Sequence, residues 1–244
     1  MTGFEALPGQ VVVEADENAV AAAAATWLAE QVAGADGPFR IALAGGTTPR
    51  RLYTRLAVEP AGLAFERWVV FFGDERAVPP DDPQSNLHMA REALLDHVPV
   101  PPEAIHRMDA EHPDRDAAAA AYAAVLDRTC PPGPGGAPRL DVVLLGLGTN
   151  GHTASLFPGD PALDVRDRWV TPAEADYDPR ARLTLTVPVL CAARHAAFLV
   201  TGEGKGDALR EVIAGTAPAA LVRPADGTLH WFLDRAAAAS LAGR

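Results

Sequence analysis

Short apolar runs alternate with longer segments of helical character along most of the chain. Four runs rich in Val, Leu, Ile and Phe are typical of buried strands, at residues 10–15, 39–46, 67–75 and 140–148. Segments with a helix-forming composition lie between or beyond them, at residues 16–33, 48–57, 85–98 and 114–130. Further strands are predicted at 182–186 and 195–202, and a further helix at 205–215.

This alternation predicts an α/β fold in which a mostly parallel sheet is flanked by helices. With 244 residues, 48% of them hydrophobic, the chain is long enough to bury one substantial core. The densest run of proline and glycine, residues 131–138, is shorter than a typical linker, and we interpret it as a loop. We expect residues 1–244 to form a single domain with a small additional subregion.

The composition narrows the class of ligand. A formal net charge of −11 argues against nucleic-acid binding, so we expect a small ligand. The chain does not open on a signal-peptide pattern, and no window has the roughly 18 apolar residues of a membrane span. We expect a cytoplasmic location, no membrane partner, and a monomer or a weak homo-oligomer. The two cysteines and seven histidines lack metal-site spacing, so no metal is expected.

Ligands of open parallel sheets bind beyond the carboxyl ends of the strands, so the residues that follow each predicted strand are informative. The strand at 39–46 ends in Gly45 and Gly46, and Thr47 and Thr48 open the next predicted helix. Glycines let a ligand approach the backbone, threonines offer hydroxyl groups, and the N–H groups of a helix start attract phosphate. A tight turn with Thr48 as the N-cap is the alternative interpretation.

Charged residues stand at the ends of two further strands. Asp74, Glu75 and Arg76 follow an apolar run, where the carboxylates could accept hydrogen bonds from sugar hydroxyls and the guanidinium could bind an anion. Lys205 stands in a glycine-rich turn at the start of a helix, where a cation could complete an anion site. The alternatives are a solvated strand end with a local ion pair and a solvated surface lysine.

The loop after the fourth predicted strand reads GLGTNGHTASLFPG, residues 146–159. Gly146, Gly148 and Gly151 match the G-x-G-x-x-G fingerprint of dinucleotide sites, but a proline–glycine pair follows too soon for the long helix that such a site needs. We therefore expect no dinucleotide and no other cofactor. The loop instead presents His152, whose ordinary pKa of ~6.5 suits proton transfer near neutral pH. A structural or merely exposed histidine is the alternative.

Four stretches, in this order, resemble the 6-phosphogluconolactonases, which are related to the glucosamine-6-phosphate deaminases. They are AGGTTPRRLY, FFGDERAVPPDDPQSNL, GLGTNGHTASLFPG and VTGEGKGDALREV. The resemblance covers nearly the full chain. It implies a modified Rossmann-like fold without a nucleotide, and hydrolysis of 6-phospho-D-glucono-1,5-lactone to 6-phosphogluconate in the oxidative pentose phosphate pathway.

The resemblance also implies roles for individual residues. His152 would take a proton from the attacking water and return it to the leaving ring oxygen, without a covalent intermediate. Backbone N–H groups of the loop that holds Gly148 and Gly151, with Arg76, would stabilise the oxyanion. Asp74 would accept a sugar hydroxyl or orient another group. The 6-phosphate would be held by Gly45, Gly46, Thr47, Thr48 and Lys205, and also by Arg182.

One position departs from the pattern of the family. The 6-phosphogluconolactonases usually read Asp-Gly-His in the catalytic loop, whereas Asn150 precedes the Gly–His pair here. An aspartate would fix the imidazole tautomer and raise its basicity, whereas an asparagine supplies the geometry without the charge. We expect an active enzyme whose histidine is less basic, or one that borrows a carboxylate from Asp74 or Glu75.

Three other functions are compatible with parts of the sequence. A glucosamine-6-phosphate deaminase or isomerase shares the glycine loops, but ASLFPG after His152 and GDERAVP both differ from the deaminase pattern. A non-catalytic module that binds sugar phosphates is suggested by Asn150. Ser155 lies close to His152 in sequence but lacks the G-x-S-x-G elbow of serine hydrolases, which makes a serine nucleophile a minor hypothesis.

Overall fold

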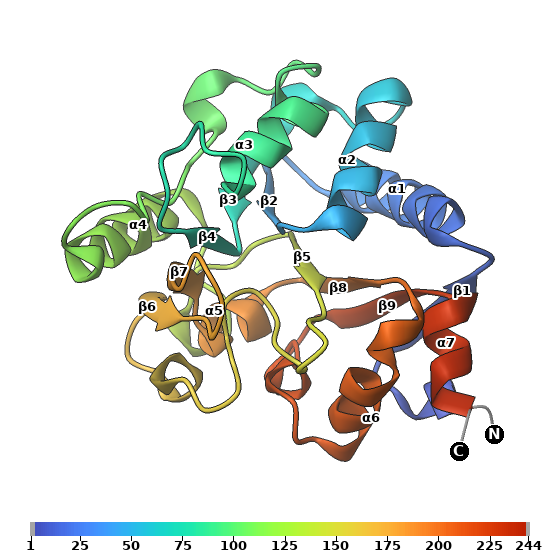
Figure 1. The fold of residues 1–244 in the computed structure, drawn as a ribbon. Helices are drawn as coiled ribbons and strands as arrows, with labels where there is room; N and C mark the ends of the chain where they lie inside the picture. Colours follow the sequence, from blue (N-terminus) through green and yellow to red (C-terminus); the bar gives the residue numbers. More distant parts are fainter. Residues whose placement is uncertain (1–2, 243–244) are drawn as a thin grey trace.

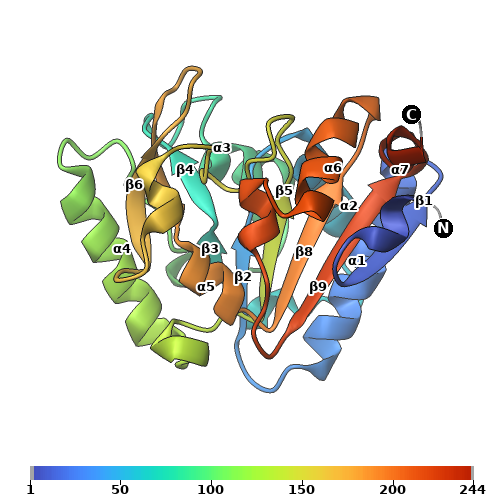
Figure 2. The same cartoon turned by 90° about the horizontal axis from the view of Figure 1, so that it is seen from below.

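A parallel sheet forms the centre of the computed structural model, which describes residues 3–242. Within those residues the sheet has six strands, and every neighbouring pair is parallel. In spatial order they are β1 (Gln10–Glu14), β9 (Thr228–Asp234), β8 (His195–Val200), β5 (Val142–Gly146), β2 (Phe39–Leu43) and β3 (Trp68–Phe72). Figure 2 shows them side by side. The predicted α/β class with a mostly parallel sheet is confirmed.

Helices cover both faces of this sheet (Figure 1). On one face lie α1 (Glu17–Gly34), α2 (Thr47–Val58) and α3 (Asn86–Ala90). On the other lie α5 (Val187–Ala192), α6 (Gly206–Ala214) and α7 (Arg235–Ala242), whereas α4 (Arg115–Thr129) packs on strand β6 at one end of the molecule. No helix within residues 3–242 is long and apolar enough to cross a membrane.

Helix α1 illustrates why the alanine-rich segments are helical. The side chain of Asp16 accepts hydrogen bonds from the N–H groups of Asn18 and Ala19 at 2.9 Å, which caps the first turn. Alanine has the highest helix propensity, and the buried residues recur on one side of the helix. They are Val20, Ala21, Ala24, Leu28 and Val32.

A second, antiparallel sheet accounts for the expected additional subregion. Its strands are β4 (Asp74–Arg76), β7 (Ala181–Leu185) and β6 (Val170–Glu174), in that spatial order. The prediction of one strand over 67–75 was wrong in this respect, because the chain leaves the parallel sheet at Gly73. The Gly73 N–H donates to Leu43 of β2, and its carbonyl accepts from Leu185 of β7, so this single residue joins the two sheets.

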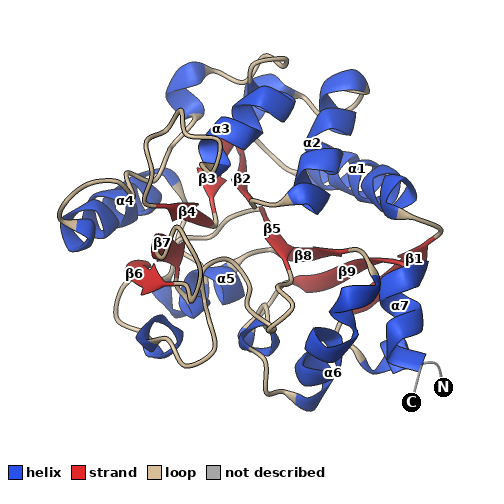
Figure 3. Cartoon of the chain, viewed as in Figure 1, coloured by secondary structure: helices blue, strands red, loops and turns tan. Residues whose placement is uncertain are grey.

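One further segment differs from the expected elements, and the loop after β5 agrees with them. The helix predicted over 85–98 is shorter: Ser85 caps α3, its side chain accepting from the His88 N–H at 3.2 Å, and a wider helical turn over Arg91–Leu95 follows. The loop after β5 contains no α-helix before residue 160, as expected from its proline and glycine (Figure 3). The carboxyl ends of β2, β3 and β5 therefore open onto loops at the same edge of the sheet.

Two histidines share a buried hydrogen-bonded chain in strands β8 and β9, away from this edge. His195 Nδ1 lies 2.7 Å from Thr228 Oγ1, which lies 2.8 Å from His230 Nε2, and Trp27 packs against both imidazoles. Burial, reinforced by the neighbouring His195, lowers the pKa of His230 to about 4. An unfolded histidine binds a proton near pH 6.5, so the unfolded state binds more protons than the folded state between these two values.

This difference predicts an acid-sensitive fold. As the pH falls from about 6.5 towards 4, protonation of the unfolded state should lower the free energy of unfolding, by about 1–2 kcal/mol at pH 5. Urea unfolding at pH 7.5 and pH 5 measures this loss in the wild type and in His230→Gln, which should lose less. The exposed His97→Gln is the matched control and should behave like the wild type. An equal loss in both variants would contradict the assignment to His230.

Candidate active site

A cavity of about 200 Å³ lies beyond the carboxyl ends of the parallel strands, between the two sheets. Its lining includes every site residue predicted from the sequence except Asn150 and Gly151. These lining residues are Gly45, Gly46, Thr47, Thr48, Asp74, Arg76, Gly148, His152, Arg182 and Lys205. Residues from five segments far apart in the sequence therefore meet at one place, which is where the strand-end rule predicts a ligand.

The amino end of helix α2 faces this cavity with uncapped N–H groups. The helix begins at Thr47, and its N-cap is Gly46, whose φ of +105° suits glycine and which offers no side-chain cap. The interpretation of Thr48 as the N-cap was therefore wrong, and the Thr48 hydroxyl lies instead 2.8 Å from that of Thr201. A Cβ atom at Gly45 would overlap the Asn86 amide. The free N–H groups and the helix dipole favour an anion here.

Two arginines lie opposite each other on neighbouring strands of the second sheet. Arg76 of β4 pairs with Arg182 of β7 in the antiparallel ladder, and both line the cavity. Arg76 Nη1 donates to the Gln84 carbonyl at 2.6 Å. Among the described residues, Nε of Arg76 and both Nε and Nη2 of Arg182 are buried without a hydrogen-bond partner. Like charges opposite one another are destabilising, so this pair is suited to an anionic ligand.

Burial also lowers the pKa values of two cations that line the cavity. Arg182 is only 1% exposed, and burial, with the charge of Arg76, lowers its pKa. Lys205 donates from Nζ to the Leu147 carbonyl at 2.7 Å, and burial lowers its pKa. Cations that have lost part of their hydration gain more from a bound anion than cations in water do.

The loop after β5 holds His152 by a short turn. Gly148 N–H donates to the His152 carbonyl at 2.8 Å, and Gly151 N–H donates to the Gly148 carbonyl at 3.0 Å. Gly151 has a φ of +76°, and a Cβ there would lie 2.7 Å from that of Ala217, so this glycine packs rather than lining the cavity. Because the N–H groups of Gly148 and Gly151 are already engaged, they are not free to act as oxyanion donors.

Asn150 fixes the tautomer of the imidazole. Its Oδ1 accepts a hydrogen bond from the backbone N–H of His152 at 3.3 Å, which identifies the atom as the amide oxygen. The same oxygen lies 2.5 Å from His152 Nδ1, so Nδ1 must carry the proton. In the neutral ring the other nitrogen, Nε2, is then unprotonated and can accept a proton. Asn150 therefore acts through His152 without lining the cavity.

The surroundings of His152 keep the ring neutral. Burial lowers the pKa of the imidazole below its usual range, and the carboxylate of Asp74 partly opposes this effect. The positive charges of Lys205 and Arg182 lower the pKa further. Phe157 covers one side of the ring, with 4.6 Å between ring centroids. The imidazole of His152 is therefore mostly neutral near pH 7.

The two neighbouring carboxylates have different positions. Asp74 lines the cavity, accepting from Ser155 Oγ at 2.6 Å and from Asn86 Nδ2 at 3.2 Å. Because the Ser155 hydroxyl donates to a carboxylate, it is not arranged as a histidine-activated nucleophile.

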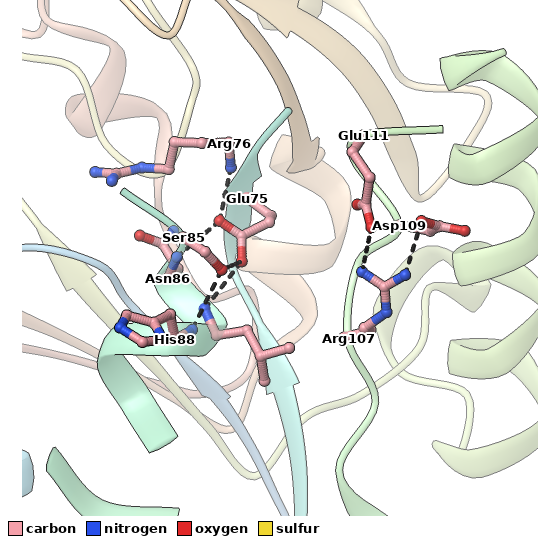
Figure 4. A network of polar contacts seen from close by, with 9 residues as sticks. Glu75, Arg76, Ser85, Asn86, His88, Arg107, Asp109 and Glu111 are labelled. Atoms are coloured by element: carbon pink, nitrogen blue, oxygen red, sulfur yellow. Dashed lines mark hydrogen bonds and ion pairs between the residues drawn. The ribbon is translucent and has the colours of Figure 1, made fainter. Parts of the chain in front are cut away.

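Glu75 points the other way, towards the start of α3 (Figure 4). It accepts from Ser85 Oγ at 3.0 Å and from the N–H groups of Asn86 and Leu87 at 2.8 and 2.9 Å, while burial raises its pKa. Side chains alternate along a strand, which explains why Asp74 and Arg76 reach the cavity and Glu75 does not. Glu75 is therefore not a carboxylate that His152 can borrow.

Two residues at or next to the cavity were not predicted from the sequence as site residues. Asn86 lies against Gly45 and also donates to Asp74, so it connects the loop before α2 with the carboxylate. Tyr177 lies in the turn between β6 and β7 and lines the cavity. The turn carries no periodic pattern that could have placed this residue. Within residues 3–242, no group of three or more His, Cys, Asp or Glu side chains is arranged to hold a metal ion.

Comparison with known proteins identifies the family. Residues 15–231 match the family described as glucosamine-6-phosphate isomerases/6-phosphogluconolactonase. The chain belongs to this family. The 6-phosphogluconolactonase of a Nostoc species is 44% identical over 210 residues, which cover 84% of this chain and 85% of the relative. The human 6-phosphogluconolactonase is 39% identical over 243 residues, which cover 95% and 93%.

Solved structures agree with this assignment. The 6-phosphogluconolactonase of Trypanosoma brucei superimposes with a TM-score of 0.87 at 32% identity, covering 96% of this chain and 99% of that chain. A monomeric glucosamine-6-phosphate deaminase superimposes with a TM-score of 0.80 at 22% identity, covering 95% and 99%. At that identity the second match shows a shared fold alone.

The packing of His152 predicts that Gly148 cannot be enlarged. A Cβ atom at this position would overlap the imidazole ring, so Gly148→Ala should displace His152 and break its contact with Asn150. We expect turnover of a 6-phosphogluconolactone to fall about a hundredfold, while circular dichroism shows a folded protein. Gly34→Ala is the control, because a Cβ there meets nothing within 4 Å. Full activity of Gly148→Ala would show that the ring does not depend on this glycine.

Proposed function

We propose that this chain hydrolyses 6-phospho-D-glucono-1,5-lactone to 6-phosphogluconate. The observation that carries the proposal is a neutral histidine of fixed tautomer in the same cavity as two arginines, whose guanidinium groups include nitrogens without a hydrogen-bond partner within residues 3–242. The histidine provides a base that can take a proton from water, and the cations provide a place for the phosphate of the substrate. Relatives at 39–44% identity that are named 6-phosphogluconolactonases support the same reaction.

The 6-phosphate is assigned to the amino end of α2 and the cations beside it. Gly46, Thr47 and Thr48 offer N–H and hydroxyl groups at an uncapped helix start. Lys205 and Arg182 line the same cavity and supply positive charge. A phosphate bound here is held by several groups at once, which fixes the distance from it to the lactone carbonyl at the other end of the sugar.

Hydrolysis then needs three events: a proton leaves water, the oxyanion at C1 is stabilised, and a proton reaches the leaving ring oxygen. Nε2 of His152 removes a proton from water as the water oxygen bonds to C1 of the lactone. The resulting oxyanion is stabilised by Arg76, since two N–H groups of the β5 loop are engaged within the turn. Collapse of the intermediate breaks the bond from C1 to the ring oxygen, which takes the proton from His152. The product is the open-chain acid, and no covalent enzyme intermediate forms.

Asp74 is assigned a supporting role at the sugar. Its carboxylate is held by Ser155 and Asn86 and still lines the cavity, so it can accept a hydrogen bond from a sugar hydroxyl. Its negative charge also favours the protonated form of His152, which appears once water has given up its proton. The cytoplasmic location and the monomeric or weakly associating state stay predictions.

Removal of the base tests the proposal. The substrate is generated in situ by glucose-6-phosphate dehydrogenase, and its opening is followed against the uncatalysed rate. We expect the wild type to accelerate opening and His152→Ala to lose about 10²- to 10⁴-fold, because it lacks the general base. His97→Gln, on the surface, is the control. A wild type that binds 6-phosphogluconate without accelerating opening would be the sugar-phosphate binding module.

The pH profile tests the role of Asn150. In the wild type, kcat/KM should fall with acid only below about pH 6.5, because the pKa of His152 is lowered. Asn150→Asp places a carboxylate against the Nδ1 proton, which favours the charged imidazole and raises its pKa. The acid limb should then move to higher pH by about one unit or more.

The double variant Asn150→Asp, His152→Ala is the control for this shift. Any residual activity in it should lack the displaced limb, since the titrating ring is gone. An acid limb that stays in place in Asn150→Asp would show that His152 is not the group whose titration limits the rate.

A further inference from the structure

Tyr177 is an exposed aromatic residue at the cavity. The turn that carries it is closed by a hydrogen bond from Ala175 N–H to the Arg180 carbonyl at 2.8 Å. Tyr177 is 47% exposed, one of three large apolar side chains that are exposed within residues 3–242, the others being Val58 and Leu221. It is the member of this group that lines the active-site cavity. An exposed aromatic ring at the edge of a binding cavity is more often a contact for a ligand than a part of the core.

The ring of Tyr177 contacts the groups to which the chemistry is assigned. The guanidinium carbon of Arg182 lies 5.4 Å from the ring centroid, within the range of a cation–π interaction. The His152 imidazole lies 6.5 Å away between centroids, and Phe157 meets the ring edge-on at 6.0 Å. Tyr177 therefore packs on the side of the cavity where the base and the buried arginine meet.

The contact with Arg182 differs from an ordinary ion pair. A carboxylate would accept the guanidinium N–H groups and neutralise the charge. An aromatic face attracts the charge but occupies no N–H donor, since the guanidinium lies over the ring. Nε and Nη2 of Arg182 have no hydrogen-bond partner within the described residues. The donors are thus left for a ligand while the guanidinium itself is held.

We infer that Tyr177 is a positioning residue that holds Arg182 for the phosphate of the substrate and so sets the preference for a phosphorylated lactone. The inference rests on the proposed function, because the phosphate assigned to Arg182 belongs to that substrate. It predicts an effect on the binding of the phosphorylated substrate and little effect on the hydrolytic step, since Nε2 of His152 and its partner Asn150 are not changed.

The test compares two substrates and two replacements. Tyr177→Phe keeps the aromatic face, whereas Tyr177→Leu keeps an apolar side chain without it. For 6-phosphogluconolactone, Tyr177→Leu should raise KM about tenfold with kcat within about twofold, and Tyr177→Phe should stay within about twofold of the wild type. For the unphosphorylated glucono-1,5-lactone, both variants should keep kcat/KM within about twofold. Val58→Ala is the control for loss of an exposed apolar group away from the cavity.

Three results would overturn the inference. An equal loss for both lactones in Tyr177→Leu would mean that the residue only supports the shape of the cavity. An equal loss in Tyr177→Phe and Tyr177→Leu would assign the effect to the hydroxyl group and not to the aromatic face. Unchanged kinetics in Tyr177→Leu would mean that Arg182 is held without this ring.

The inference and the proposed function can fail separately. If the wild type does not accelerate lactone opening, the proposed function fails and calorimetry with 6-phosphogluconate replaces the kinetic readout. Tyr177→Leu should then weaken binding of this compound about tenfold, whereas Tyr177→Phe should not. Equal affinity in all three proteins would overturn the role of Tyr177 as well.

Discussion

Two arginine side chains lie opposite each other on the β4–β7 ladder, and three of their guanidinium nitrogens have no hydrogen-bond partner within the described residues. Arg182 is almost completely buried, with two guanidinium nitrogens that lack a partner within the described residues. Such an arrangement is destabilising by itself, and its use lies in what it can bind. The uncapped start of α2 and the half-buried Lys205 add to the same positive field. Together these positive groups favour the binding of an anion in the cavity.

The imidazole of His152 has a fixed tautomer and a lowered pKa. Asn150 fixes which nitrogen of His152 carries the proton, and burial together with nearby cations keeps the ring neutral. A base with a lowered pKa is a weaker proton acceptor but is fully available at neutral pH. An aspartate in the same place would reverse that balance, giving a stronger base that is protonated over more of the pH range.

Strand ends and glycine patterns were sufficient to predict which segments meet. The residues after β2, β3, β5 and β8 line one cavity because parallel strands bring their carboxyl ends to one edge. The sequence could not predict that Asp74 lines the cavity while Glu75 points towards the start of α3. This difference follows from the alternation of side chains along β4, a short strand that the sequence did not reveal. The contact of Asn150 with His152 depends on an amide orientation, and that of Tyr177 on the path of a turn, and neither leaves a periodic signal.

Gly73 determines how closely the two sheets are joined on either side of the cavity. One residue separates the last position of β3 in the parallel sheet from the first of β4 in the antiparallel sheet, and its backbone is hydrogen-bonded to both β2 and β7. A joint of this length leaves little freedom for one sheet to rotate away from the other. Walls that are joined in this way favour a pre-formed cavity, which loses little conformational entropy when a ligand binds.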